Sequence, residues 1–105
     1  MIHVPAACQR EIRRLPFEIR ADLADALARL DEGLALSMPL SRPTPTIGRS
    51  VRELRIKNRS GQYRIIYALI ERGSIHVLHA FKKTTESTPK RIIEIARQRL
   101  TEVRR

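Results

Sequence analysis

The chain has 105 residues, a formal net charge of +10 and a single cysteine, Cys8. This length predicts one domain, residues 1–105, with one hydrophobic core, and a lone cysteine excludes an intramolecular disulfide and a cysteine-based metal cluster. The longest apolar run, Ile65–Ile70, is too short to span a membrane, and no signal peptide is recognisable, so we expect a cytoplasmic protein without a membrane partner.

Two helices are predicted in the first third of the chain. Met1–Val4 is long enough only for a short edge strand. The first helix is expected over about Pro5–Arg14 because three apolar residues recur there at helical spacing, Cys8, Ile12 and Leu15. After Pro16, a second helix is predicted over Phe17–Glu32, and Gly33 ends it in the left-handed conformation. The apolar stripe of this helix consists of Ile19, Leu23, Ala26, Leu27 and Leu30.

Prolines determine the character of the next segment, Leu34–Ser50. Three of them fall within seven residues, Pro39, Pro43 and Pro45. Because proline lacks a backbone N–H and clashes with the preceding helical turn, neither a helix nor a central strand is expected here. We therefore predict an extended connector, short enough to lie within one domain.

Three consecutive strands are predicted in the second half of the chain. The runs Val51–Lys57, Gln62–Glu71 and Ser74–Phe81 are rich in β-branched and aromatic residues and alternate in polarity. The short segments between them suit two-residue hairpin loops at Ser60-Gly61 and Arg72-Gly73. These features indicate an antiparallel meander.

Two-residue loops would pair the strands so that one face of the sheet is basic and the other is apolar. The expected pairs are Lys57 with Arg64, Arg64 with Phe81, Arg55 with Ile66, and Ile66 with His79. Since side chains alternate along a strand, one open, basic face would hold Arg55, Lys57, Arg64, His79, Phe81 and Lys83. The other face would carry a core of Leu54, Ile56, Ile65, Tyr67, Leu69, Leu78 and Ala80, covered by the two N-terminal helices. The apolar end of the basic face, Val51, Ile70, Ile75 and Val77, needs a separate cover.

A final helix is predicted from Thr88, as N-cap, and Pro89, as first helical residue. Its apolar stripe is Ile92, Ala96, Leu100 and Val103. Residues 51–105 hold fourteen Lys plus Arg against five Glu, a charge of +9, whereas residues 1–50 contribute +1. The basic side chains of the helix extend the charge of the sheet: Lys90, Arg91, Arg97, Arg104 and Arg105. Nucleic acid is therefore the predicted partner class, ahead of an anionic membrane.

Cations beside a histidine on an open sheet face suit the binding and cleavage of a phosphodiester. Cleavage through the RNA 2′-hydroxyl needs a proton acceptor, cations that stabilise the developing charge, and a proton donor. No phosphate loop, HExxH, Cys cluster or Gly-x-Ser-x-Gly motif occurs, so neither a metal nor a cofactor is expected. A lone strand histidine is more often structural than catalytic, and exposed cations are commonly just solvated. His3 and His76 are poor candidates, and His76 is expected on the sheet face opposite to His79.

Five segments together carry a family pattern: Arg52–Arg55, Gly61–Tyr67, Val77–Thr84, Thr88-Pro89 and Ile95-Ala96. They resemble the RelE/HigB superfamily of bacterial toxins, and more closely its phage Gp49-like branch. The combined pattern is fairly specific, whereas each segment alone is a weak signal. The resemblance implies an α/β (α+β) fold, with an N-terminal helical hairpin packed on a small curved antiparallel β-meander and a C-terminal helix.

The resemblance also implies a function, the toxin of a type II toxin–antitoxin system. Such toxins cleave mRNA on the ribosome and are neutralised by a cognate antitoxin, often a helix-turn-helix protein, in a hetero-oligomer. The catalytic tyrosine of RelE has no counterpart after Lys83, so His79 is the candidate general acid or base. The expected catalytic residues are Arg64, Lys57, His79, Lys83 and Arg55. The expected substrate-binding residues are Lys82, Phe81, Tyr63, Arg59, Lys90 and Arg91, with Phe81 or Tyr63 as a stacking surface for a base.

Two other functions stay open at this point. One is a ParE-like toxin that inhibits DNA gyrase without being a nuclease, and the other is a plain RNA- or ribosome-binding protein. Relatives of ParE generally lack the basic set formed here by Arg55, Lys57, Arg64 and Lys83, which favours the nuclease.

Overall fold

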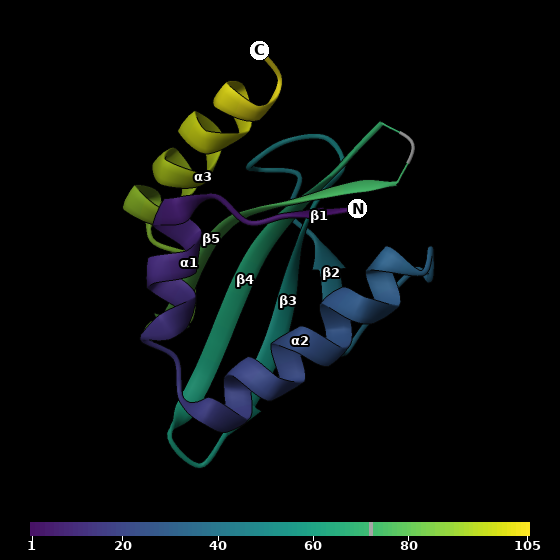
Figure 1. The fold of residues 1–105 in the computed structure, drawn as a ribbon. Coiled ribbons are helices and arrows are strands. Elements are labelled where there is room, and N and C mark those ends of the chain that lie inside the picture. Colours follow the sequence, from purple (N-terminus) through teal and green to yellow (C-terminus); the bar gives the residue numbers. More distant parts are fainter. Residues whose placement is uncertain (72) are drawn as a thin grey trace.

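The computed structural model describes residues 1–71 and 73–105 as one sheet with helices on both faces (Figure 1). The elements in chain order are β1 (Ile2–His3), α1 (Ala6–Arg13), α2 (Phe17–Asp31), β2 (Ser41–Pro43), β3 (Val51–Asn58), β4 (Gly61–Ile70), β5 (Ser74–Lys83) and α3 (Lys90–Val103). The strand order is β1-β5-β4-β3-β2, antiparallel except for the parallel pair β1–β5. The predicted α+β fold is confirmed. None of the described helices is long and apolar enough to cross a membrane.

Prolines set the start of all three helices. Pro5, Pro16 and Pro89 are the N-cap residues of α1, α2 and α3, each with an extended ψ between 145° and 157°. The prediction of Thr88 as N-cap is therefore wrong by one residue, because Pro89 itself is still outside the helical region. At the other end of α2, Gly33 has φ 88°, the left-handed conformation predicted for it.

The segment predicted as a connector contains one short strand, β2, which the sequence analysis missed. β2 is an edge strand and pairs only with β3. No strand lies on its outer side, so the missing N–H of Pro43 costs no hydrogen bond there. Polar contacts fix this edge strand. The buried Ser41 hydroxyl lies 2.6 Å from Tyr67 Oη and accepts a hydrogen bond of 3.0 Å from Arg52 Nε.

The first hairpin differs from its predicted register by two residues. Asn58 faces Gly61, so the loop is Arg59-Ser60 rather than Ser60-Gly61. The Asn58 side chain explains this choice, because its Oδ1 accepts hydrogen bonds from the Ser60 backbone N–H at 2.8 Å and from its hydroxyl at 2.6 Å. The predicted pairs Lys57–Arg64 and Arg55–Ile66 are thus wrong. The observed pairs are Arg55–Arg64 and Lys57–Gln62, and a shift of two keeps every side chain on its predicted face.

The second hairpin has the predicted register at one end and a β-bulge in the middle. Arg64 faces Phe81 and Ile66 faces His79 as predicted, but the register shifts between Ile66 and Tyr67. Beyond this bulge the faces of β5 are exchanged relative to the prediction. Ile75 and Val77 join the core under α1 and α2, whereas Leu78 and His76 lie on the α3 face, the face of His79. The predicted Arg72-Gly73 loop includes residue 72 and lies outside the described residues.

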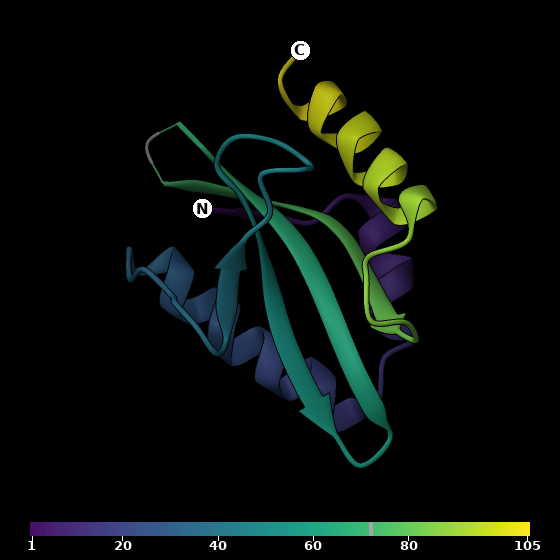
Figure 2. The ribbon, with the colours of Figure 1, turned by 180° about the vertical axis from the view of Figure 1, so that it is seen from behind.

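Two apolar cores form, one on each face of the sheet. α1 and α2 cover the first, as predicted from their stripes. The second lies under α3, whose buried residues Ile92, Ala96 and Leu100 pack on Val51, Ile66 and Ala68. The sequence predicts that Val51 and Ile70 need a cover, and in the structure α3 provides it. Figure 2 shows that α3 covers only one end of this face, and that the hairpin end of β3 and β4 has no helix over it.

Candidate functional site

The uncovered end of the α3 face carries most of the predicted site. Pairing places its side chains in three adjacent rungs across the strands: Arg42–Glu53–Ile66–His79, Arg55–Arg64–Phe81 and Lys57–Gln62–Lys83. Neighbouring rungs on one face are about 6.7 Å apart along a strand. Arg64 thus has one cation beside it, Arg55, and two more on the next rung, Lys57 and Lys83. The second and third rungs, which have no helix over them, are defined here as the basic site, and the first rung borders it, with Ile66 under α3.

A cavity of about 260 Å³ opens on the basic site. Its lining residues are Pro39, Arg55, Lys57, Gln62 and Arg64. Three of these five are cations and none is a carboxylate or an imidazole, so the cavity favours an anion such as a phosphate. Within residues 1–71 and 73–105, no three His, Cys, Asp or Glu side chains are grouped to hold a metal ion.

Arg64 forms the wall of this cavity and is only 4% exposed. Its Nη1 donates to the Tyr63 carbonyl at 3.2 Å and its Nη2 to Gln62 Oε1 at 3.0 Å, while its Nε lies 3.7 Å from Glu53 Oε1. Burial lowers the pKa of Arg64, and the negative charge of Glu53 opposes this shift. A guanidinium has five N–H donors, so the two hydrogen bonds leave donors for a phosphate. The expectation that the open face exposes Arg64 is wrong, because the side chain folds onto Gln62 and the backbone.

Lys83 is the half-buried amine of the basic site. Its Nζ donates to the Glu86 carbonyl at 2.8 Å. Burial and then the positive charge of Arg64 lower its pKa from the ordinary value of a lysine, 10.5. This amine therefore loses its proton more easily than a lysine on an open surface does, which suits a group that accepts a proton. Lys57, in contrast, is exposed on the same rung.

Two charged residues of this face, Glu53 and Arg42, were missed by the sequence analysis. Glu53 is 1% exposed and forms an ion pair of 2.6 Å with Arg42 Nε. The signal for Glu53 was present, because strand alternation places this single carboxylate on the face of Arg55 and Lys57. Arg42 gave no such signal, since its strand lies in the segment predicted as a connector.

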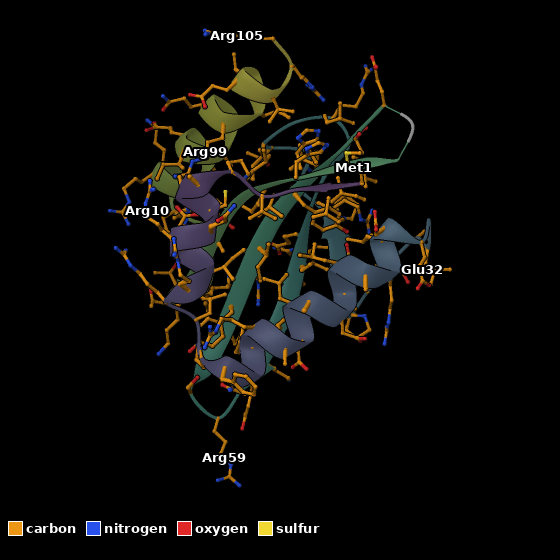
Figure 3. All side chains as sticks on the ribbon, in the orientation of Figure 1. Met1, Arg10, Glu32, Arg59, Arg99 and Arg105 are labelled. Atoms are coloured by element: carbon orange, nitrogen blue, oxygen red, sulfur yellow. The ribbon has the colours of Figure 1, made fainter. Side chains whose placement is uncertain are left out.

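His79 lies on the predicted face but outside the cavity. Its Nδ1 is 2.9 Å from Glu11 Oε2 of α1 and 3.3 Å from Arg99 Nη1 of α3, and its side chain is 9% exposed. Figure 3 shows Arg99 between these two helices. Arg99 also binds both Glu11 oxygens, at 2.9 and 3.0 Å, and the Leu78 carbonyl at 2.9 Å. The imidazole is thus part of the packing between α1, β5 and α3, rather than of the open face as predicted.

Of five other predicted residues, one belongs to the basic site and four lie outside it. Phe81 is half-buried beside Arg64, with its ring 5.3 Å from that of His79. Arg59 projects from the tip of the first hairpin (Figure 3). Lys90 and Arg91 are exposed at the start of α3. Lys82 faces Tyr63 on the opposite side of the sheet, where its methylene chain lies against Gly61.

Tyr63 does not provide a stacking surface. The ring is 4% exposed and belongs to the core under α1 and α2, and its hydroxyl lies 2.7 Å from Ser60 Oγ. Tyr63 directly precedes Arg64 in β4, and because side chains alternate along a strand, it lies on the face opposite to the basic site. Of the two aromatic candidates, the structure leaves Phe81 on the correct face.

Comparison with known families decides where the chain belongs. The model of a family described as phage-derived Gp49-like protein (DUF891) matches residues 10–101. The chain belongs to the Gp49-like family. This confirms the resemblance drawn from the five segments of the sequence. No curated protein matches this Gp49-like chain.

A solved structure shows the same fold. It is the free form of a double mutant of the E. coli toxin RelE, with a TM-score of 0.60 and 19% sequence identity over 97% of the Gp49-like chain and 95% of that chain. At this identity the similarity establishes the shared fold of the two proteins. The basic site described above rests on the geometry of the Gp49-like chain itself.

The stability of this Gp49-like protein is expected to fall as the pH drops below about 6.5, the ordinary pKa of histidine. Burial lowers the pKa of His79, and burial and the nearby His3 lower that of His76. The unfolded chain therefore binds these protons at a higher pH than the folded chain does, which favours unfolding. Urea titrations between pH 8 and pH 5 measure the effect.

The matched control for this prediction is His79→Asn, whose amide can donate to Glu11 without titrating. The decrease in the free energy of unfolding between pH 7.5 and 5 should be smaller in this variant than in the parent. Equal decreases would show that His79 does not contribute.

Proposed function

We propose that this protein is the toxin of a type II toxin–antitoxin system and acts in the cytoplasm as a ribosome-dependent, metal-independent mRNA endoribonuclease. A cognate antitoxin, of the helix-turn-helix type, neutralises it in a hetero-oligomer. The observation that carries the proposal is the cavity walled by Arg55, Lys57 and Arg64 on a sheet end without helical cover. Family membership and the fold shared with RelE support it.

In this mechanism the RNA 2′-hydroxyl attacks the adjacent phosphorus and the bond to the 5′-oxygen breaks. The products are a 2′,3′-cyclic phosphate and a 5′-hydroxyl. Arg64 and Arg55 stabilise the negative charge that builds up on the phosphoryl oxygens. Lys83, as a neutral amine, takes the proton of the 2′-hydroxyl, and the Lys57 ammonium gives a proton to the leaving oxygen. Phe81 stacks on a base, and Lys90 and Arg91 contact phosphates of mRNA or rRNA.

Primer extension on cellular mRNA after induction of the chain tests this function. Lys57→Met and Arg13→Met both remove one exposed cation, the first from the basic site and the second from α1. New mRNA ends are expected with the parent and with Arg13→Met, and few or none with Lys57→Met. Growth arrest without new ends, together with loss of gyrase supercoiling activity, would instead indicate a ParE-like toxin. RNA binding without cleavage or arrest would indicate a plain RNA-binding protein.

RNA affinity is expected to fall steeply as salt rises, because the half of the chain that carries +9 meets RNA through phosphates. About six neutralised phosphates correspond to a loss of about 10³-fold in affinity between 50 and 200 mM salt. Fluorescence anisotropy with a labelled RNA measures the slope. Arg91→Gln should reduce the log–log slope by about 1, and Arg13→Gln should leave it unchanged. A slope near zero for the parent would contradict the electrostatic account.

A further inference from the structure

Glu53 is the one carboxylate on the three rungs of the basic face, and it is almost completely buried. Its side chain is 2% exposed, and its Oε1 lies 2.6 Å from Arg42 Nε and 3.7 Å from Arg64 Nε. Burial of a carboxylate is strongly unfavourable unless its charge is paired and hydrogen-bonded. This oxygen lies near two arginines, so the role of Glu53 depends on its effect on each of them.

The two arginines differ in how much they need a partner. The Arg42 side chain is 44% exposed and hydrated, whereas that of Arg64 is 5% exposed. An exposed ion pair contributes little, but a buried guanidinium has lost its water and depends on the groups around it. The Glu53 carboxylate faces the Nε side of Arg64, while Gln62 Oε1 and the Tyr63 carbonyl hold the two terminal nitrogens. The carboxylate therefore acts on Arg64 through its charge, because its hydrogen bond goes to Arg42 and Arg64 Nε has no hydrogen-bond partner among the described residues.

The surrounding charges support this assignment. Burial and the positive charges of Arg55 and Arg42 lower the pKa of Arg64, and Glu53 is the group that opposes these effects. Glu53 opposes the lowering of the Lys83 pKa in the same way. Without the carboxylate, Arg64 and its cationic neighbours would repel one another with no negative charge between them.

We propose that Glu53 is a positioning residue, whose buried carboxylate orients the Arg64 guanidinium in the cavity wall and holds the neighbouring cations close enough to act on one phosphate. Glu53 touches no reacting atom and acts through Arg64. The inference rests on the proposed function, because it assigns Glu53 a part in RNA cleavage.

Single-turnover cleavage and RNA affinity of Glu53→Gln, Glu53→Asp and Glu32→Gln test the proposal. Glu53→Gln keeps the size of the side chain and removes its charge, and should slow cleavage about 10²-fold, the order of effect that a misplaced reacting group produces. Its RNA affinity should be unchanged or higher, because the basic face loses its one negative charge. Glu53→Asp keeps the charge and should recover part of the rate. Glu32→Gln makes the same charge change at an exposed position after α2, away from the basic site, and should match the parent.

Two results would overturn the proposal. One is cleavage by Glu53→Gln at the parent rate. The other is a parallel loss of rate, RNA affinity and melting temperature in Glu53→Gln with no recovery in Glu53→Asp, which would make the carboxylate merely structural.

An NMR measurement separates failure of this proposal from failure of the proposed function. The Nε–H signal of Arg64, identified by its absence in Arg64→Lys, should be sharp in the RNA-free parent and broadened in Glu53→Gln. If the parent cleaves no RNA, the nuclease function fails, and this signal still decides whether Glu53 fixes Arg64. An unchanged signal in Glu53→Gln would contradict the positioning role.

Discussion

Arg64→Ala is expected to slow RNA cleavage about 10²- to 10³-fold, the cost of removing one donor aimed at charge that develops in the transition state. The same change should lower the free energy of unfolding by about 1 to 3 kcal/mol, because the buried Tyr63 carbonyl loses its donor, whereas the exposed Gln62 side chain can bond to water instead. The larger penalty of an unpaired buried charge is not reached, since Glu53 keeps its ion pair with Arg42. Single-turnover kinetics and urea titrations give the two numbers.

Arg64→Lys separates the catalytic from the structural part of this effect. It keeps the positive charge but loses the fork of N–H donors that a guanidinium presents to a phosphate. Most of the loss in rate should therefore remain in Arg64→Lys. A lysine variant that is as fast as the parent would mean that Arg64 contributes charge alone. A loss of rate that merely follows the fraction of unfolded protein would make the arginine structural.

Lys83→Met is expected to slow cleavage about 10²- to 10⁴-fold, the range for a side chain that transfers a proton in the transition state. Stability should change by only about 0.5 kcal/mol, because the side chain is partly exposed and belongs to neither apolar core. The parent rate should rise with pH toward the pKa of Lys83, which burial and Arg64 place below 10.5. The measurement is a pH profile of the single-turnover rate.

Lys83→Arg is the control that keeps the charge and removes the titration. It should bind RNA as tightly as the parent, cleave as slowly as Lys83→Met, and lack the rising limb of the pH profile. Cleavage by Lys83→Arg at the parent rate would show that position 83 needs a positive charge and no proton transfer.

Strand alternation made the basic site predictable, because the error in the register of the first hairpin is an even number of residues. The loop of the first hairpin is one position earlier than predicted, which shifts the pairing by two residues, yet Arg55, Lys57 and Arg64 stay on one face. The same parity argument excludes Tyr63 and Lys82 from that face. Lys82 is predicted as a substrate-binding residue from its place in the family pattern, and Tyr63 as an aromatic surface for a base.

The environment of each side chain could not be predicted from the sequence. Arg64 and Glu53 are buried because Gln62, Arg42 and the short strand β2 gather around them. His79 is enclosed because α1 and α3 bring Glu11 and Arg99 to it from distant parts of the chain. Such contacts depend on how elements cross in space, about which a local pattern carries no information.

The bulge between Ile66 and Tyr67 also could not be predicted from the sequence pattern. It adds one residue to β5 without any glycine or proline to signal it. Its effect is large, because it transfers Ile75 and Val77 to the core under α1 and α2 and turns Leu78 toward α3. One inserted residue thus decides which side chains each helix covers.

The contacts of α1 along β5 affect how copies of this protein behave at high concentration. Glu11 Oε1 accepts the backbone N–H of Ala80 at 3.2 Å, and the Cys8 thiol donates to the Val77 carbonyl at 3.3 Å. The edge strand on this side is the two-residue β1, and beyond it these two groups of β5 are occupied by α1; the opposite edge strand is the three-residue β2 with Pro43. Unpaired strand edges are the usual templates for aggregation and strand exchange. Edge strands this short, with part of β5 bonded to α1, offer little template for the strand pairing that leads to fibres.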